Sequence, residues 1–171
     1  WDFAIQARGH HNTEKLGENC KVWLEKHIRG DSHFWPSRPS SEIKLGQDGV
    51  PELHLSPASP EKIKEVQIYQ CLKTANNIAR FWRDVESRRE GSQWIAKLPV
   101  LNINDYLFSY ANIRYENNIV ISSDFEAVIP SDLGQAVATD QPSDELPGGA
   151  SLWKDAAPAE GVGGIEGFRP L

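Results

Sequence analysis

The sequence predicts a mainly β protein, an antiparallel sandwich preceded by one strand and one long helix. Two observations carry this prediction. Only one segment, in the first thirty residues, repeats its apolar residues with the helical period. Beyond it the period falls to two, in short runs that are separated by turn residues and have no helix between them. Runs of this kind are typical of a β-sandwich.

The first element is a predicted strand at residues 1–8, in which large apolar residues alternate with smaller or polar ones. A loop containing Gly9, His10 and His11 follows. Asn12 or Thr13 can then cap a helix, and Gly30 can end it. The helix has one apolar stripe, formed by Leu16, Cys20, Trp23, Leu24, His27 and Ile28.

Residues 31–47 contain Pro36 and Pro39 and read as an extended linker. Residues 48–126 read as an immunoglobulin-like or fibronectin-like sandwich. Its strands are expected at residues 53–56, 66–71, 93–100, 107–115 and 119–121, with turns at 76–77, 90–91 and 117–118. Much of its core should come from Phe81, Trp82, Trp94, Phe108 and Tyr110.

Residues 127–171 read as an acidic tail rich in proline and glycine, or as the start of a further module, because apolar residues return in GVGGIEGFRPL. Residues 1–129 carry 16 Lys and Arg against 17 Asp and Glu, a net charge of −1, whereas residues 130–171 carry 2 against 7, a net of −5. This balance gives no sign of a nucleic-acid-binding surface. No apolar run approaches the roughly 18 residues of a membrane span.

The two cysteines, Cys20 and Cys71, are too few to define a disulfide framework. Cys20 falls on the apolar stripe and Cys71 in a strand, so we expect two buried small side chains. Whether they pair is left open. The chain has no methionine, and its first five residues resemble the middle of a strand, so we expect a piece of a longer protein.

Nucleophilic catalysis by a serine on an α/β fold usually needs a Gly-x-Ser-x-Gly turn, and the sequence has none. The order of strand, Gly-His loop and capped helix nevertheless matches the place where such enzymes carry their acid–base histidine. The alternative for His10 and His11 is an ordinary polar loop. A metal site and a cofactor are not expected, because no histidine pair has helical ligand spacing and no Cys-x-x-Cys is present.

Exposed aromatic residues raise a third possibility, the binding of carbohydrate by ring stacking. Trp35 and Trp82 are the tryptophans most expected to be exposed, and they are the candidate ligand-binding residues. The alternative is that most tryptophans belong to the core, since a sandwich of this size needs large side chains.

Three stretches together resemble the C-terminal part of bacterial secreted α/β-hydrolases of the dienelactone hydrolase and PhoPQ-activated pathogenicity-related type. These are GHHNTEKLGENCKVWLEKHIRGD, with its W-x-x-x-H-x-x-G pattern, ARFWRDVESRREGSQWIAKLPV and LFSYANIRY. The first is similar to the histidine loop and last helix of the hydrolase domain. The other two are similar to the β-sandwich extension that follows it in some members.

The resemblance implies hydrolysis of ester or acyl bonds in a small molecule or polysaccharide, with His10, or else His11, as the acid–base residue. It implies that the nucleophile lies upstream of Trp1, so that this polypeptide alone would be inactive. It also implies a secreted or periplasmic protein. The rival hypothesis is a non-catalytic sandwich module that binds carbohydrate or a protein partner.

Overall fold

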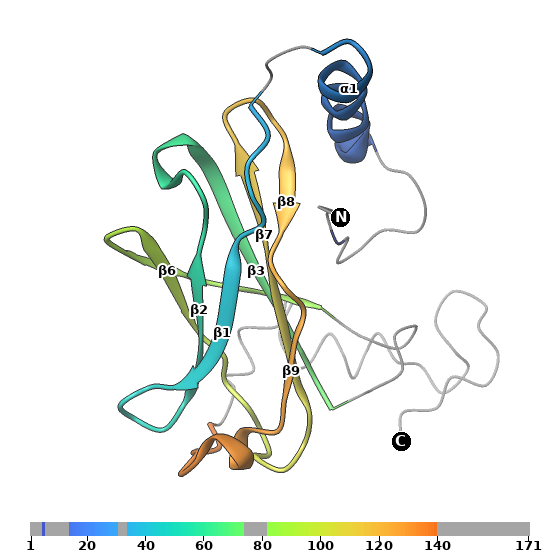
Figure 1. The fold of residues 1–171 in the computed structure, drawn as a ribbon. Coiled ribbons are helices and arrows are strands. Elements are labelled where there is room, and N and C mark those ends of the chain that lie inside the picture. Colours follow the sequence, from blue (N-terminus) through green and yellow to red (C-terminus); the bar gives the residue numbers. More distant parts are fainter. Residues whose placement is uncertain (1–4, 6–13, 31–33, 74–81, 140–171) are drawn as a thin grey trace, which may run out of the picture. The chain divides into compact units, whose positions relative to one another are not determined.

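The computed structural model describes residues 5, 14–30, 34–73 and 82–139, with side chains omitted for residues 14–16. It is a mainly β structure with two antiparallel sheets and a single α-helix among the described residues (Figure 1). The predicted β-sandwich is therefore confirmed. The helix α1 spans Glu14–Ile28, and Gly30 follows it with a positive φ of 73°. Position 30 thus has the left-handed backbone that favours glycine after a helix.

The first sheet, sheet A, has the strand order β1-β2-β6-β5. Its strands are β1 (Ser40–Leu45), β2 (Pro51–Ser56), β6 (Gln93–Lys97) and β5 (Arg88–Glu90). Residues 31–47 are expected to form a linker, and this prediction is wrong for the part that forms β1. Pairing of β1 with β2 along its whole length makes residues 40–45 part of the sandwich.

The second sheet, sheet B, has the order β4-β3-β7-β8, with β9 also paired to β7. Its strands are β3 (Ile63–Leu72), β4 (Arg83–Val85), β7 (Leu107–Tyr115), β8 (Val120–Ser122) and β9 (Glu126–Val128). Strands β3 and β7 run antiparallel along their full length and form the centre of the sheet. Short 3-10 turns occupy Pro60–Lys62 and Pro130–Leu133.

The main core lies between the sheets and is built from alternate residues of the central strands. Leu53 and Leu55 of β2 face Ile68 of β3 and Ile113 of β7, and all four are almost completely buried. Trp94 belongs to this core, as expected. Tyr115 is also buried there, and its hydroxyl donates to the Ala58 carbonyl at 3.0 Å. The period-two pattern therefore identified the inward faces of β2, β3 and β6 correctly. The expectation for Trp82, Phe108 and Tyr110 is wrong for this core, because they are buried in a separate cluster.

Residues 130–139 belong to the sandwich and not to the tail predicted for residues 127–171. The Val137 amide donates to the Gly49 carbonyl at 2.9 Å, and the Thr139 amide donates to the Val100 carbonyl at 2.7 Å. Strand β9 likewise covers residues 126–128. By its contacts the chain divides into one unit at residues 1–139 and another at residues 140–171. The second unit lies outside the described residues.

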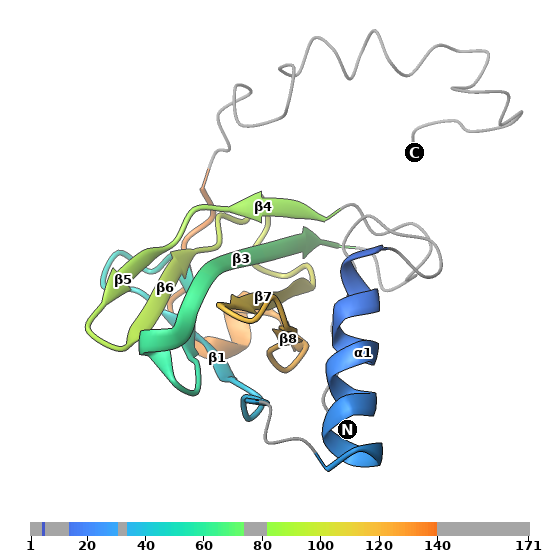
Figure 2. The same cartoon turned by 90° about the horizontal axis from the view of Figure 1, so that it is seen from above.

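Helix α1 lies beside β8 (Figure 2). Val22 is buried in the main core, and Asn19 is hydrogen-bonded to β8. Trp23, Leu24 and Ile28, which belong to the apolar stripe, are 47%, 46% and 71% exposed. Among the described residues, these three side chains of the stripe therefore stay largely at the surface.

Candidate functional site

The residues predicted to carry catalysis, His10 and His11, lie outside the described residues, so their role stays a prediction. Among the described residues, no group of three or more His, Cys, Asp or Glu side chains could hold a metal ion. Within the same ranges, no helix is long and apolar enough to cross a membrane. Three surfaces of the described chain then remain as candidate sites.

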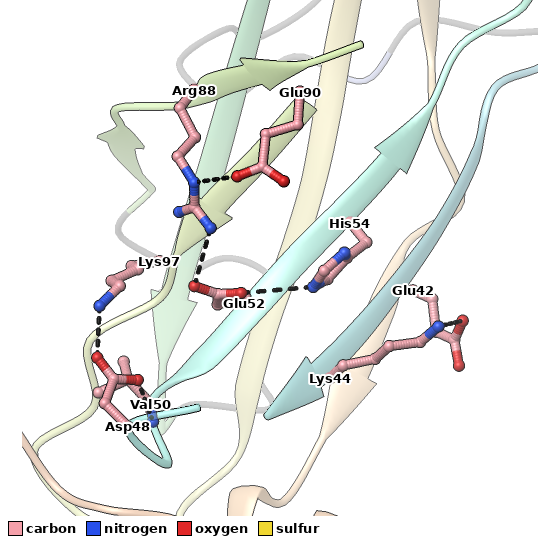
Figure 3. Close-up of polar contacts among 9 residues, drawn as sticks. All are labelled: Glu42, Lys44, Asp48, Val50, Glu52, His54, Arg88, Glu90 and Lys97. Carbon is pink, nitrogen blue, oxygen red and sulfur yellow. Dashed lines mark hydrogen bonds and ion pairs between the residues drawn. The ribbon is translucent and has the colours of Figure 1, made fainter. Parts of the chain in front are cut away.

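The first surface is the outer face of sheet A, where charged side chains gather around Glu52 (Figure 3). The Glu52 carboxylate is only 10% exposed, and it lies 3.5 Å from His54 and 3.4 Å from Arg88. Arg88 also donates to Glu90 at 2.7 Å.

At the edge of the same face, Lys97 binds Asp48, and the hydrogen bond from Lys97 lowers the pKa of the Asp48 carboxyl. The Val50 amide donates to the same carboxyl at 3.2 Å. Lys44 lies 2.9 Å from Glu42. These charged side chains form ion pairs with one another, as is typical of a solvated polar face. They do not surround a common position where a ligand could bind.

The second surface is the outer face of sheet B, where aromatic side chains form a cluster. Its buried members are Tyr69, Cys71, Trp82, Phe108 and Tyr110. Tyr69 and Cys71 come from β3, and Phe108 and Tyr110 come from β7, at positions that alternate with the inward core residues. We call this set, together with the neighbouring rings of Tyr106 and Phe125, the aromatic cluster.

The rings of the aromatic cluster cover one another. Tyr106 stacks on Phe108 with 5.7 Å between ring centroids, and Phe125 lies 5.8 Å from Phe108. Trp82 meets Tyr110 edge-on at 4.8 Å. Tyr106 and Phe125 remain 47% and 38% exposed, and they are the rings of the cluster that a ligand could reach.

Tyr110 is the most deeply buried member of the aromatic cluster. Its side chain is inaccessible to solvent, and burial is the main cause that raises the pKa of its hydroxyl. Among the residues that the structure describes, this hydroxyl has no hydrogen-bond partner. An unsatisfied buried hydroxyl is costly, so it marks a place where a polar atom would be stabilised.

Next to the aromatic cluster, two side chains hold the main chain of Ile5. The Ile5 amide donates to Ser122 Oγ at 2.6 Å, and Asn112 Nδ2 donates to the Ile5 carbonyl at 2.8 Å. Ser122 Oγ in turn donates to Asn112 Oδ1 at 2.5 Å. We call this pair, Asn112 and Ser122, the amide clamp. The Ile5 side chain packs against the aromatic cluster.

The third surface is the apolar stripe of α1. Besides its three large exposed residues it includes Cys20, which is exposed and not paired with Cys71. The expectation that Cys20 is buried is wrong, whereas Cys71 is buried as expected. The Trp23 and His27 rings pack together on this helix with 5.0 Å between centroids.

Of the two predicted ligand-binding tryptophans, Trp82 is 9% exposed and belongs to the aromatic cluster, so its expected exposure is not observed. Trp35 is half-buried against the main core. The structure does not bring them together in one cluster. The exposed rings are Tyr106 and Phe125, and neither was predicted from the sequence. The signal that points to them is the period of two in β7, which places Phe108 and Tyr110 together on the outer face of that strand.

Comparisons of the sequence with protein-family models and with curated proteins find no match. Among solved structures, the chain is similar to one titled "Crystal structure of Br derivative BhCBM56". The match covers 58% of this chain and 99% of that chain, at 14% sequence identity and a TM-score of 0.38. A likeness of this degree supports no conclusion about function.

Proposed function

We propose that this chain is the C-terminal part of an α/β-hydrolase-type enzyme, in which the apolar stripe of α1 packs against the hydrolase domain and the sandwich is a non-catalytic extension. The proposal combines the sequence resemblance of residues 9–31 with one structural observation. The most regular apolar pattern in the sequence lies on a helix face that stays largely exposed within the part of the chain that the structure describes.

The exposed stripe supports the proposal because an amphipathic helix is stabilised mainly by burial of its apolar face. Here α1 contacts the sandwich through Val22 and through the polar side chain of Asn19. Trp23, Leu24 and Ile28 are left at the surface. A contiguous apolar patch of this kind is typical of a protein–protein or domain–domain interface.

In the proposed enzyme, His10 accepts the proton of a serine nucleophile and returns it to the leaving group of an ester or acyl substrate. His11 is the alternative. The nucleophile, the acidic partner of the histidine and the oxyanion hole would come from the hydrolase domain. The same resemblance leads us to propose secretion or a periplasmic location.

The test is to express the whole encoding reading frame and to measure hydrolysis of p-nitrophenyl esters of increasing acyl length. We expect His10→Ala to abolish hydrolysis and His11→Ala to leave most of it. If both variants hydrolyse the esters as fast as the unsubstituted enzyme, neither histidine is the acid–base residue. A reading frame without a serine or cysteine nucleophile would refute the proposal as a whole.

The docking part of the proposal has its own test in the same protein. Ile28→Asp should destabilise the hydrolase domain in the whole protein while leaving the unfolding of the isolated chain unchanged. Leu101→Asp is the matched control, because Leu101 is 63% exposed on the sandwich and outside the stripe. Equal effects of the two substitutions would show that the stripe is not an interface.

A second candidate function is carbohydrate binding at the aromatic cluster, and the exposure of Tyr106 and Phe125 favours it. A sugar face that buries roughly 30–50 Å² of a ring gains about 0.8–1.3 kcal/mol, at about 25 cal/mol per Å² of apolar surface. We therefore expect Tyr106→Ala and Phe125→Ala each to weaken binding to a polysaccharide roughly three- to tenfold.

The measurement is affinity electrophoresis against a panel of soluble polysaccharides. Leu101→Ala serves as a control, because Leu101 is 63% exposed and lies outside the aromatic cluster. Absence of retardation by every polysaccharide, or retardation that both alanine variants preserve, would exclude this function for the aromatic cluster.

A further inference from the structure

Strand β8 binds the chain on both sides of residues 6–13. Before these residues, the amide clamp binds the main chain of Ile5, whose amide donates to Ser122 Oγ at 2.6 Å. After them, Asn19 of α1 donates to the Val120 carbonyl at 2.6 Å and accepts from the Val120 amide at 2.9 Å. Two separate attachments therefore lie on one short strand.

The two attachments are close together in space. Val120 and Ser122 are the two ends of β8. Because a strand rises about 3.3 Å per residue, their Cα atoms lie about 7 Å apart. The sandwich thus fixes two points of the chain, at Ile5 and at Asn19, to the same stretch of sheet B.

Each attachment is held in place by further contacts within the sandwich. Ser122 Oγ donates to Asn112 Oδ1 at 2.5 Å, and this bond orients the Asn112 amide toward the Ile5 carbonyl. The two residues also oppose one another in the register of β7 and β8. On the helix, Asn19 uses both ends of its side-chain amide, and Val22 nearby is buried in the main core. Neither attachment is a single isolated bond.

The residues between the attachments include His10, the proposed acid–base residue, and His11, its alternative. His10 follows Ile5 so closely in sequence that an extended chain separates the two by at most about 18 Å. An acid–base residue must reach its nucleophile within hydrogen-bond distance. A misplacement of about 1 Å can lower the rate about 100-fold. Contacts that fix the chain on both sides of the histidine can therefore affect catalysis.

We propose that the sandwich positions the acid–base histidine of the enzyme. The amide clamp, Asn112 and Ser122, fixes the chain before the histidine, and Asn19 fixes it afterwards. These three are positioning residues and take no part in the chemical step. The inference rests on the proposed hydrolase function and deepens it, because it makes the β-sandwich extension necessary for full turnover.

The test compares Ser122→Val with Ser122→Thr in the enzyme expressed from the whole reading frame. Valine and threonine have nearly the same shape, but only threonine keeps a hydroxyl that can bind Ile5. We expect Ser122→Val to lower kcat for p-nitrophenyl esters about tenfold with little change in KM, and Ser122→Thr to restore most of it. Asn19→Leu should lower kcat in the same way. Asn104→Ala, which removes an exposed asparagine elsewhere, should change neither constant.

Hydrogen exchange tests the attachments themselves in the chain described here. Ser122→Val removes the acceptor of the Ile5 amide, and Asn19→Leu removes the acceptor of the Val120 amide. We expect each of these amides to exchange about tenfold faster in the corresponding variant, with rates in β3 unchanged. If neither rate changes, the sandwich does not hold the chain at these two points and the proposal is wrong.

The two measurements separate this inference from the hydrolase proposal. A whole protein that hydrolyses no ester overturns both. If the enzyme is active and His10→Ala abolishes hydrolysis, but Ser122→Val and Asn19→Leu keep the kcat of the unsubstituted enzyme, only the positioning role is wrong. Equal kcat values for Ser122→Val and Ser122→Thr would also overturn it for the amide clamp.

Discussion

Replacing the apolar stripe of α1 by alanine should hardly change the stability of the isolated chain, although periodicity alone would make the stripe a core element. Full burial of a Leu, Ile or similar side chain contributes about 1.5–3 kcal/mol. Trp23 and Leu24 are 47% and 46% exposed, and Ile28 is 71% exposed. We therefore expect Trp23→Ala and Leu24→Ala each to cost no more than about 1.5 kcal/mol, and Ile28→Ala no more than about 1 kcal/mol. Alanine is also the best helix former, which offsets part of that cost.

The assay is equilibrium unfolding in urea, followed by circular dichroism so that the loss of a tryptophan does not affect the signal. Leu53→Ala is the matched control in the core, since Leu53 is fully buried. It should cost roughly 2–5 kcal/mol. A loss above about 2 kcal/mol at any stripe position, with an unchanged m-value, would show that the stripe packs within this chain and would refute the reasoning.

Three other predictions concern single contacts. Asn19→Ala removes both hydrogen bonds between its amide and the Val120 main chain, at 2.6 and 2.9 Å, so it should cost about 1–2 kcal/mol in the same urea assay; an unchanged midpoint would mean that α1 is not attached there. Tyr110→Phe removes the unsatisfied buried hydroxyl and should raise stability by up to about 1 kcal/mol, whereas a clear loss would reveal a partner for it. Burial raises the pKa of Tyr115 from 10.0 to about 12, and because the folded state favours the neutral phenol, its contribution is complete below pH 10 and is lost as the pH rises toward 12. Unfolding midpoints across this range should fall less steeply in Tyr115→Phe than in the unsubstituted chain, and identical slopes would contradict the assignment.

The elements with strong local patterns could be predicted from the sequence. Strand β7 coincides with the predicted range 107–115, and Asn118, in the predicted turn, has a positive φ of 63°. Strand β1 was missed because SSEIKL follows two prolines and shows little alternation. Its strand character comes from pairing with β2, a contact that local propensity does not encode.

The candidate sites were less predictable because they depend on contacts between distant residues. Periodicity identified the apolar stripe of α1 correctly. It does not indicate which surface the stripe packs against. Ile5 is 107 residues from Asn112 and 117 from Ser122 in sequence. No local pattern around Ile5, Asn112 or Ser122 indicates that these residues are in contact. The amide clamp could therefore be found only from the fold.

The attachment of α1 through Asn19 has a consequence for how the protein behaves in solution. Strand β8 ends the strand order of sheet B, and strands at a sheet edge carry main-chain groups that can pair with another molecule. The Asn19 amide occupies both the N–H and the carbonyl of Val120, as a neighbouring strand would. Asn19 thus occupies the outward main-chain groups of Val120, and we expect a version trimmed to begin after Gly30 to expose them to pairing with another molecule.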